Sequence, residues 1–348
     1  MPACDPAALL RDRGSPAQLQ VYAHGRVVLD ESYRCPPDSL FFLFSAGKPL
    51  VALAVHLLAE RGELALDDPV AKYWPAFGQR GKQDITIRHV LQHRGGLPVA
   101  RGMPIDALVM TDWPASVRAI ARAAPAYPPG EVPAYHILTF GFILGEVVQR
   151  VTGRPVRDFV RDELLIPLGL AGDICLGLPA ACWDRHVPVG GRGPAEFVTR
   201  LVINRRATRQ AVIPAASVSA TAAGLAGLYQ TLLDGGRGVL APQTIASATR
   251  PSSDGTVDRY LKLPIRWSEG FQLGGERPGG ARAGGGYAPM GSMASRQAFG
   301  HNGSYVCLGW ADPERQIAMA YLTSRLVSRS AGAQHMSAVS DAVLAAFG

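Results

Sequence analysis

The chain has 348 residues, of which 47% are hydrophobic and 18% charged, so it can bury a large core and is not disordered in composition. Its net charge of +7 is scattered along the sequence, which argues against a nucleic-acid partner. No apolar run approaches the ~18 residues of a membrane span and no secretion signal is visible, so we expect a cytoplasmic protein with no membrane partner.

The first predicted element is a β-hairpin. Residues 19–33 contain two runs of strand-forming residues joined by a His-Gly pair, which is typical of a hairpin turn. Helical spacing of apolar residues follows, and three of the four helical segments end at glycine. These segments are residues 45–61, 87–93, 139–152 and 220–233.

The C-terminal part begins with a glycine-rich segment, residues 274–300, which we expect to form a mobile flap over a cleft. A second hairpin is predicted from residues 304–311 and 316–324, which flank a Asp-Pro-Glu-Arg turn. Residues from about 331 to 347 then have helical spacing and should pack on the sheet. Both chain ends therefore supply strands, and a helical block lies between them.

The arginines and cysteines carry weaker signals. A local excess of arginine, at Arg200, Arg205, Arg206 and Arg209, predicts a solvated face or a surface for an anionic substrate or partner. The five cysteines contain no CxxC pair, so we expect reduced thiols rather than disulfides or a zinc site.

Ser45 and Lys48 open the first predicted helix at positions i and i+3, which places both side chains on one face. A serine hydroxyl needs a base to become a nucleophile, and a lysine serves as that base only where burial or charge lowers its pKa. The helix that follows is apolar on nearly every side, which predicts that it runs through the core. Taken alone, the pair is also consistent with a helix cap beside a solvated lysine.

The companions of this S-x-x-K pattern identify a family. The chain resembles the serine β-lactamase and penicillin-binding-protein superfamily, and most closely its family VIII carboxylesterase branch. The similarity covers most of the chain in order, through residues 40–77, 85–98, 127–153, 166–170, 218–236, 266–275 and 299–314. It implies an α/β (α+β) β-lactamase/transpeptidase-like fold, in which an antiparallel sheet flanked by helices carries an inserted all-helical region.

The resemblance implies one catalytic unit over 1–348. We expect a sheet subdomain at about 1–44 and 265–348 and a helical subdomain at about 45–264, with Ser45 at the floor of the cleft between them. No metal and no organic cofactor is implied.

Roles for the second motif also follow from the resemblance. Tyr135, five residues after a Pro-Gly turn, is implied to shuttle a proton between Ser45 and the leaving group, with Lys48 lowering its pKa. An ordinary core tyrosine is the alternative. His136 is expected to contact substrate, and Ile137 stands where class C β-lactamases carry an amide-binding asparagine, which favours esters over lactams.

The third motif is implied to be His301-Asn302-Gly303, on an edge strand that lines the cleft. His301 and Asn302 are expected to bind substrate, His301 as a hydrogen-bond donor. The backbone N–H of Ser304 would pair with that of Ser45 to form an oxyanion hole.

Other side chains support weaker hypotheses. His89 and His93 are spaced i, i+4 and resemble a metal pair, but no third ligand is near in sequence, so chance pairing on a surface helix is the preferred interpretation. Trp74, Trp267 and Trp310 are candidates for an acyl pocket, with core packing as the default.

The predicted function is a serine hydrolase that forms an acyl-enzyme on Ser45 and cleaves carboxylic esters of small or medium acyl groups. The alternatives are an acyltransferase that moves the acyl group to an alcohol or amine in a secondary-metabolite pathway, a weak β-lactamase or peptidase, and a non-catalytic binding relative. No glutamate is placed as a separate deacylating base, so we expect Tyr135 and Lys48 to serve both half-reactions.

Overall fold

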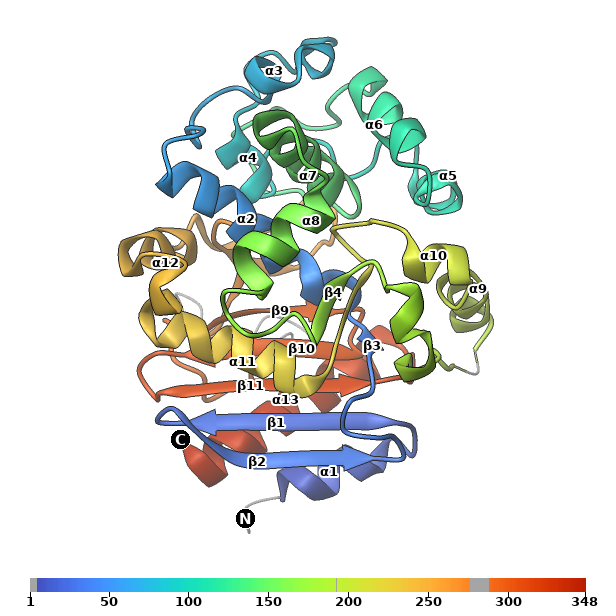
Figure 1. Cartoon of the computed structure of the whole chain (residues 1–348), viewed down its shortest axis with the longest axis vertical. Helices are drawn as coiled ribbons and strands as arrows, with labels where there is room; N and C mark the ends of the chain where they lie inside the picture. The colour runs from blue at the N-terminus through green and yellow to red at the C-terminus, as the bar shows by residue number, and fades with distance from the viewer. Residues whose placement is uncertain (1–4, 192, 276–287) are drawn as a thin grey trace.

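The computed structural model describes residues 5–191, 193–275 and 288–348. Its main element is an eight-stranded antiparallel sheet in the order β2-β1-β11-β10-β9-β8-β7-β6 (Figure 1). The strands are β1 (Ala17–Ala23), β2 (Arg26–Tyr33), β6 (Ser253–Val257), β7 (Pro264–Trp267), β8 (Gln272–Leu273), β9 (Phe299–Gly303), β10 (Cys307–Asp312) and β11 (Ile317–Thr323). Both predicted hairpins are confirmed, as β1–β2 and β10–β11.

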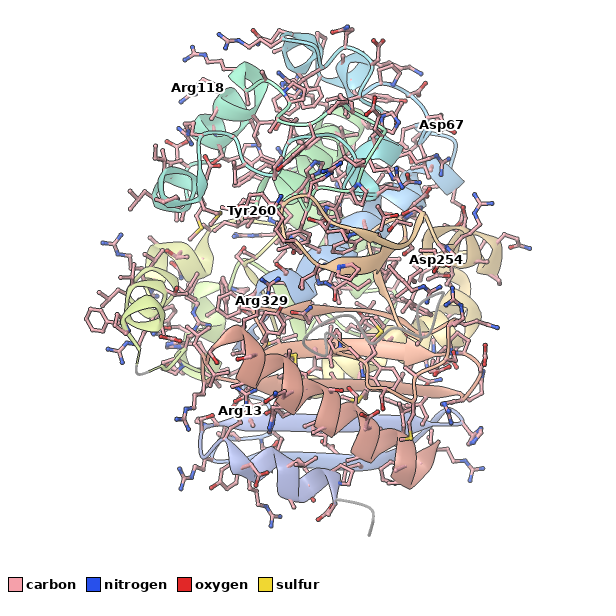
Figure 2. The ribbon with its side chains drawn as sticks, turned by 180° about the vertical axis from the view of Figure 1, so that it is seen from behind. Arg13, Asp67, Arg118, Asp254, Tyr260 and Arg329 are labelled. Atoms are coloured by element: carbon pink, nitrogen blue, oxygen red, sulfur yellow. The ribbon has the colours of Figure 1, made fainter. Side chains whose placement is uncertain are left out.

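Helices cover both faces of this sheet, which explains why β10 and β11 are buried along their whole length. One face carries α11 (Ala222–Leu233), which contacts β1, β10 and β11 (Figure 1). The close approach of α11 requires Gly309, because a Cβ there would lie 2.5 Å from the ring of Tyr229. The other face carries α1 (Pro6–Asp12) and α13 (Arg329–Phe347), which Figure 2 shows from behind.

The remaining helices form a second region, on the side of the sheet that is opposite to β1 and β2 (Figure 1). They are α2 (Lys48–Glu60), α3 (Val70–Tyr73), α4 (Ile87–Leu91), α5 (Met103–Val109), α6 (Trp113–Arg122), α7 (Thr139–Thr152), α8 (Val156–Val160), α9 (Pro194–Ile203), α10 (Arg206–Gln210) and α12 (Pro242–Thr249). A small sheet, β3 (Phe41–Phe42), β5 (Val218–Ala220) and β4 (Ile174–Leu176), joins the two regions. In the described parts of the chain, no helix is long and apolar enough to cross a bilayer.

The structure differs from the predicted division at two places. Strand β6 and the start of β7 belong to the main sheet although they precede residue 265. Helix α11 packs on the sheet rather than within the inserted helices. Local apolar spacing identifies such elements, but the layer in which each one packs depends on long-range contacts.

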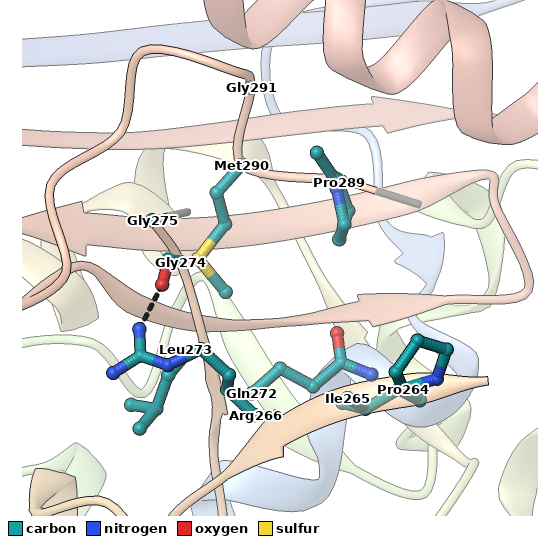
Figure 3. A pocket seen from close by; sticks show the side chains of 11 residues that line it. Pro264, Ile265, Arg266, Gln272, Leu273, Gly274, Gly275, Pro289, Met290 and Gly291 are labelled. Atoms are coloured by element: carbon teal, nitrogen blue, oxygen red, sulfur yellow. Dashed lines mark hydrogen bonds between the residues drawn. The ribbon is translucent and has the colours of Figure 1, made fainter. Parts of the chain in front are cut away.

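The predicted flap lies partly outside the described residues, at 276–287. Its described C-terminal flank is held on the α13 side of the sheet, where the Asp341 carboxylate accepts N–H groups of Ser292 and Met293 at 2.6 and 3.2 Å. The Asp312 carboxylate likewise accepts the N–H of Ser295 at 2.8 Å. A hollow between β7, β8 and this flank is lined by Gln272 and Met290, among others (Figure 3).

Candidate active site

Ser45 lies in a tight 3-10 turn, η1 (Phe44–Gly47), which leads directly into the buried helix α2. The residue before it, Phe44, has φ = 49°, a left-handed conformation that costs energy for a non-glycine residue and often marks functional turns. The predicted helix therefore begins three residues late, at Lys48. Gly303 of β9 packs against the same turn, because a Cβ there would lie 1.9 Å from the Leu43 carbonyl oxygen.

Lys48 is buried in the first turn of α2, with 1% of its surface exposed. Its Nζ lies 3.1 Å from Ser45 Oγ and 3.2 Å from the carbonyl oxygen of Ala215. Burial lowers the pKa of Lys48 well below its usual value. Because no described carboxylate forms an ion pair with Lys48, a neutral amine is favoured beside the serine hydroxyl.

Tyr135 completes the group around Ser45. Its hydroxyl forms a hydrogen bond with Ser45, and Lys48 Nζ lies 4.8 Å from the centre of its ring. Burial raises the pKa of Tyr135, and the hydrogen bond with Ser45 offsets only part of that rise. This differs from the expectation that Lys48 lowers the tyrosine pKa, because burial disfavours the charged phenolate and is the largest influence on this group. Tyr135 is therefore a phenol in the resting site.

Three other residues support the tyrosine without belonging to an obvious motif. The ring of Trp267 stacks on Tyr135 with centroids 5.4 Å apart and planes 12° apart. His93 is also buried there, with its ring centre 4.7 Å from that of Tyr135. The carboxylate of Asp258 accepts the backbone N–H of Tyr135 at 3.1 Å.

These positions correct two of the expectations. His93 does not lie on a surface helix, because α4 ends at Leu91 and His93 turns inward with φ = 57°. His89 instead caps α4, receiving the N–H of Thr86 on Nδ1 at 3.3 Å. In the described ranges no group of three His, Cys, Asp or Glu side chains is arranged to hold a metal ion.

The three tryptophans have core positions. Trp267 is the platform under Tyr135, and Trp310 packs in the separate core beneath α13. Trp74 packs against Phe77 in the helical region. The stacking of Trp267 on Tyr135 has no local sequence signal, because the two residues are distant along the chain, whereas Trp74 and Phe77 are three positions apart.

The third motif lies where β9 passes η1. Strand β9 is not an edge strand as expected, since β8, β7 and β6 continue the sheet beyond it. However, β8 pairs only with Phe299 and Gly300, so the part from His301 onward has a strand partner on one side only. Asn302 fills this place with a side-chain bond, donating from Nδ2 to Gln272 Oε1 at 2.9 Å.

The proton of the His301 ring is on Nδ1, whereas the expected role as a donor to substrate would require a proton on Nε2. Its Nδ1 lies 2.7 Å from the Asn302 carbonyl oxygen, which can only accept, so Nδ1 carries the proton. Burial lowers the pKa of His301 to about 3, and the ring is therefore neutral. Its Nε2 is buried without a described partner and presents a lone pair, so it is an acceptor rather than the expected donor.

His136 takes a supporting place. It is fully buried, its Nε2 accepts the N–H of Leu97 at 3.1 Å, and its backbone N–H donates to Nδ1 of His93 at 3.2 Å. Burial lowers the pKa of His136 to about 3. These contacts favour a role in positioning the loop beside Tyr135 over the expected contact with substrate.

Two backbone amides flank the serine. Among the described residues, neither Ser45 N–H nor Ser304 N–H donates to a backbone carbonyl. Ser304 follows Gly303, which contacts the η1 turn directly, and has φ = 47°. Free amides next to a nucleophile are the groups from which an oxyanion hole is built.

Comparison with known proteins shows the family to which the chain belongs. A family model described as Beta-lactamase matches residues 11–342. The esterase/beta-lactamase LipL of Mycobacterium tuberculosis (strain ATCC 25618 / H37Rv) is 32% identical over 329 residues, covering 84% of this chain and 70% of LipL. Esterase EstB of Burkholderia gladioli is 37% identical over 149 residues, 38% of each chain.

Two solved structures have a similar fold over 99% of this chain. The crystal structure of a family VIII carboxylesterase is 26% identical with a TM-score of 0.81, covering 99% of this chain and 98% of that one. A penicillin-binding protein homologue from Caulobacter crescentus is 29% identical with a TM-score of 0.80 and the same coverage.

The fold and these relatives define a serine hydrolase-type enzyme. The chain belongs to the beta-lactamase family, and its similarity to a family VIII carboxylesterase agrees with the branch predicted from sequence.

Proposed function

We propose that this protein is a carboxylesterase in which Ser45 attacks the carbonyl carbon of esters with small or medium acyl groups. The observation that carries the proposal is the 3.1 Å contact between Ser45 Oγ and Nζ of the buried Lys48. A lysine whose pKa is lowered by burial has a lone pair with which to accept the serine proton. The similarity to the esterase/beta-lactamase LipL and to esterase EstB supports the same reaction class.

Acylation then proceeds in balanced steps. Ser45 Oγ forms a bond to the acyl carbon while its proton passes to Lys48, and the N–H groups of Ser45 and Ser304 stabilise the oxyanion. When the ester C–O bond breaks, the leaving alkoxide needs a proton, which the Tyr135 phenol donates. The proton on Lys48 then passes to the Tyr135 phenolate, whose ring centre lies 4.8 Å from Lys48 Nζ, so that both groups regain their resting forms.

Deacylation uses the same groups in reverse. Water attacks the acyl carbon, gives its proton to the Tyr135–Lys48 pair, and the Ser45–acyl bond breaks with Oγ regaining its proton. The neutral Nε2 of His301 is suited to accept a hydrogen bond from that water or from the leaving alcohol. The acyl group leaves as a carboxylic acid.

The test is the mass of the acyl-enzyme together with its products. After rapid quenching with p-nitrophenyl esters of increasing acyl length, we expect one acyl adduct, located on the peptide that contains Ser45. The variant Ser45→Ala should lose adduct and turnover by several powers of ten while remaining folded. Ser219→Ala is the matched control, because Ser219 is also buried and its hydroxyl has no described partner.

The outcomes are distinct. Turnover that persists in a folded Ser45→Ala protein would remove the proposal. Addition of an alcohol or amine acceptor reveals whether the acyl group passes to water or to another nucleophile. Transfer product in excess of free acid would replace the esterase by an acyltransferase acting through the same serine.

A further inference from the structure

Helix α9 has its apolar residues on the outside. Phe197, Val198 and Leu201 are 47%, 62% and 54% exposed, whereas Ile203 is buried. At 100° per residue, Phe197, Leu201 and Val198 fall within one arc of about 100°, so they form a continuous ridge. A helix that only covered the protein core would present the opposite pattern. We call these three residues the α9 ridge.

Three arginines lie within α9 or directly after it. Arg205 and Arg206 are exposed at the start of α10, and Arg200 places its guanidinium 4.9 Å from the ring centre of Phe197. None of the three forms an ion pair with a described residue, although the guanidinium of Arg206 lies 5.0 Å from the ring centre of Trp183. A groove beside the ridge is lined by Arg200, Leu201 and Arg205, among others. Apolar and cationic groups therefore meet along one surface.

A second apolar pair lies on the same side of the molecule. Ile105 and Leu108 of α5 are 50% and 70% exposed and are spaced i, i+3 on one helical face. Figures 1 and 2 show α5 and α9 along the same lateral side. Five of the ten large hydrophobic residues that are exposed in the described structure thus belong to these two helices.

We propose that the α9 ridge and its arginines bind the surface of an anionic lipid bilayer, with the ridge inserted among the acyl chains and the arginines at the lipid phosphates. Exposed apolar side chains flanked by arginine are the features that hold a helix at a lipid–water interface. A second copy of the chain is a poorer occupant, because a symmetric contact across the ridge would bring like-charged arginines together. The proposal does not depend on the reaction at Ser45.

The experiment is co-sedimentation of the full chain with vesicles of phosphatidylcholine, with and without phosphatidylglycerol. We expect binding to the anionic vesicles that weakens at high salt and is much lower on neutral ones. The double variant Phe197→Ser/Leu201→Ser should weaken binding by at least about tenfold. Replacing Arg205 and Arg206 by glutamine should weaken it by roughly fivefold for each arginine.

The matched control is Val27→Ser/Val28→Ser on β2, since Val27 and Val28 are 49% and 41% exposed on a different part of the surface. This control should bind as the unchanged protein does, and circular dichroism should confirm that all variants are folded. Three results would overturn the proposal: no binding to anionic vesicles, an equal loss in the β2 control, or equal binding to neutral vesicles. A dimer in ultracentrifugation that the ridge variant dissociates would assign the ridge to a second copy instead.

Discussion

Asp258 holds Tyr135 by its main chain. A single oxygen of the buried carboxylate, Oδ1, accepts the N–H of Tyr135 at 3.1 Å and also those of Tyr260 and Leu261 at 2.9 and 2.8 Å. The loop between β6 and β7 is thereby tied to the segment that carries the phenol. Because carboxylate acceptors form strong hydrogen bonds, these three contacts hold the backbone of Tyr135 in place and so position its side chain relative to Ser45.

Replacement of this carboxylate should therefore affect both stability and catalysis. We expect Asp258→Ala to lower the free energy of unfolding by about 3 kcal/mol, since one buried and two partly buried N–H donors lose their acceptor. It should also lower kcat more than it raises KM, because Tyr135 is displaced from the leaving group. Urea unfolding and ester kinetics measure the two effects.

The control for this prediction is Asp341→Ala, because the Asp341 carboxylate also accepts backbone N–H groups but belongs to α13, on the other face of the sheet. It should lower stability without changing kcat. If both variants lose kcat in proportion to their stability, Asp258 has only a structural role. Rescue by Asp258→Asn, which retains Oδ1, would support positioning.

We expect Lys48 to be required for activity and to lower the free energy of unfolding. Burial opposes its charged form, so Lys48→Met is expected to raise the free energy of unfolding at neutral pH by about 1 kcal/mol while lowering kcat by several powers of ten. Thermal unfolding and ester hydrolysis test this opposition. Lys72→Met, which removes an exposed partner of Asp68, should leave both quantities nearly unchanged. A less stable Lys48→Met protein would mean that the Ala215 contact outweighs burial.

Acid should destabilise the fold through its buried histidines. The pKa values of His136 and His301 are lowered from 6.5 to about 3 by burial, so the unfolded chain binds more protons than the folded one between these values. Their contribution is complete above pH 6.5 and is lost as pH falls toward 3, by up to about 1.4 kcal/mol per pH unit for each histidine.

Unfolding free energies measured by urea titration across this range test the histidine contribution. His136→Gln should reduce the slope between pH 6 and 4 by roughly one proton. The variant His24→Gln is a suitable control, because His24 is exposed in the β1–β2 turn. An unchanged slope for His136→Gln would contradict the prediction.

Esters should be much better substrates than lactams. Ile137 is packed beside Tyr135 and offers no side-chain donor or acceptor where an amide would need one. A substrate whose polar group stays unpaired in a buried site loses binding, so we expect kcat/KM for a p-nitrophenyl ester to exceed that for a cephalosporin by at least about a hundredfold. Comparable kcat/KM values for the two substrates would contradict the prediction that Ile137 disfavours lactams.

Much of the architecture was readable along the chain. The two hairpins, the helix after Ser45 and the final helix depend on local turns and periodicity, which neighbouring residues determine. The i, i+3 spacing of Ser45 and Lys48 likewise brings their side chains together within one helical turn. These features need no knowledge of what packs around them.

The chemistry of the site depended on the tertiary structure. Whether Tyr135 is a phenol, whether His301 is neutral and whether His93 is buried are set by residues that are far away in sequence. The sequence names the ionisable groups, but their pKa values follow from how much water the surrounding segments exclude. That exclusion exists only after the strands from both chain ends and the inserted helices have packed together.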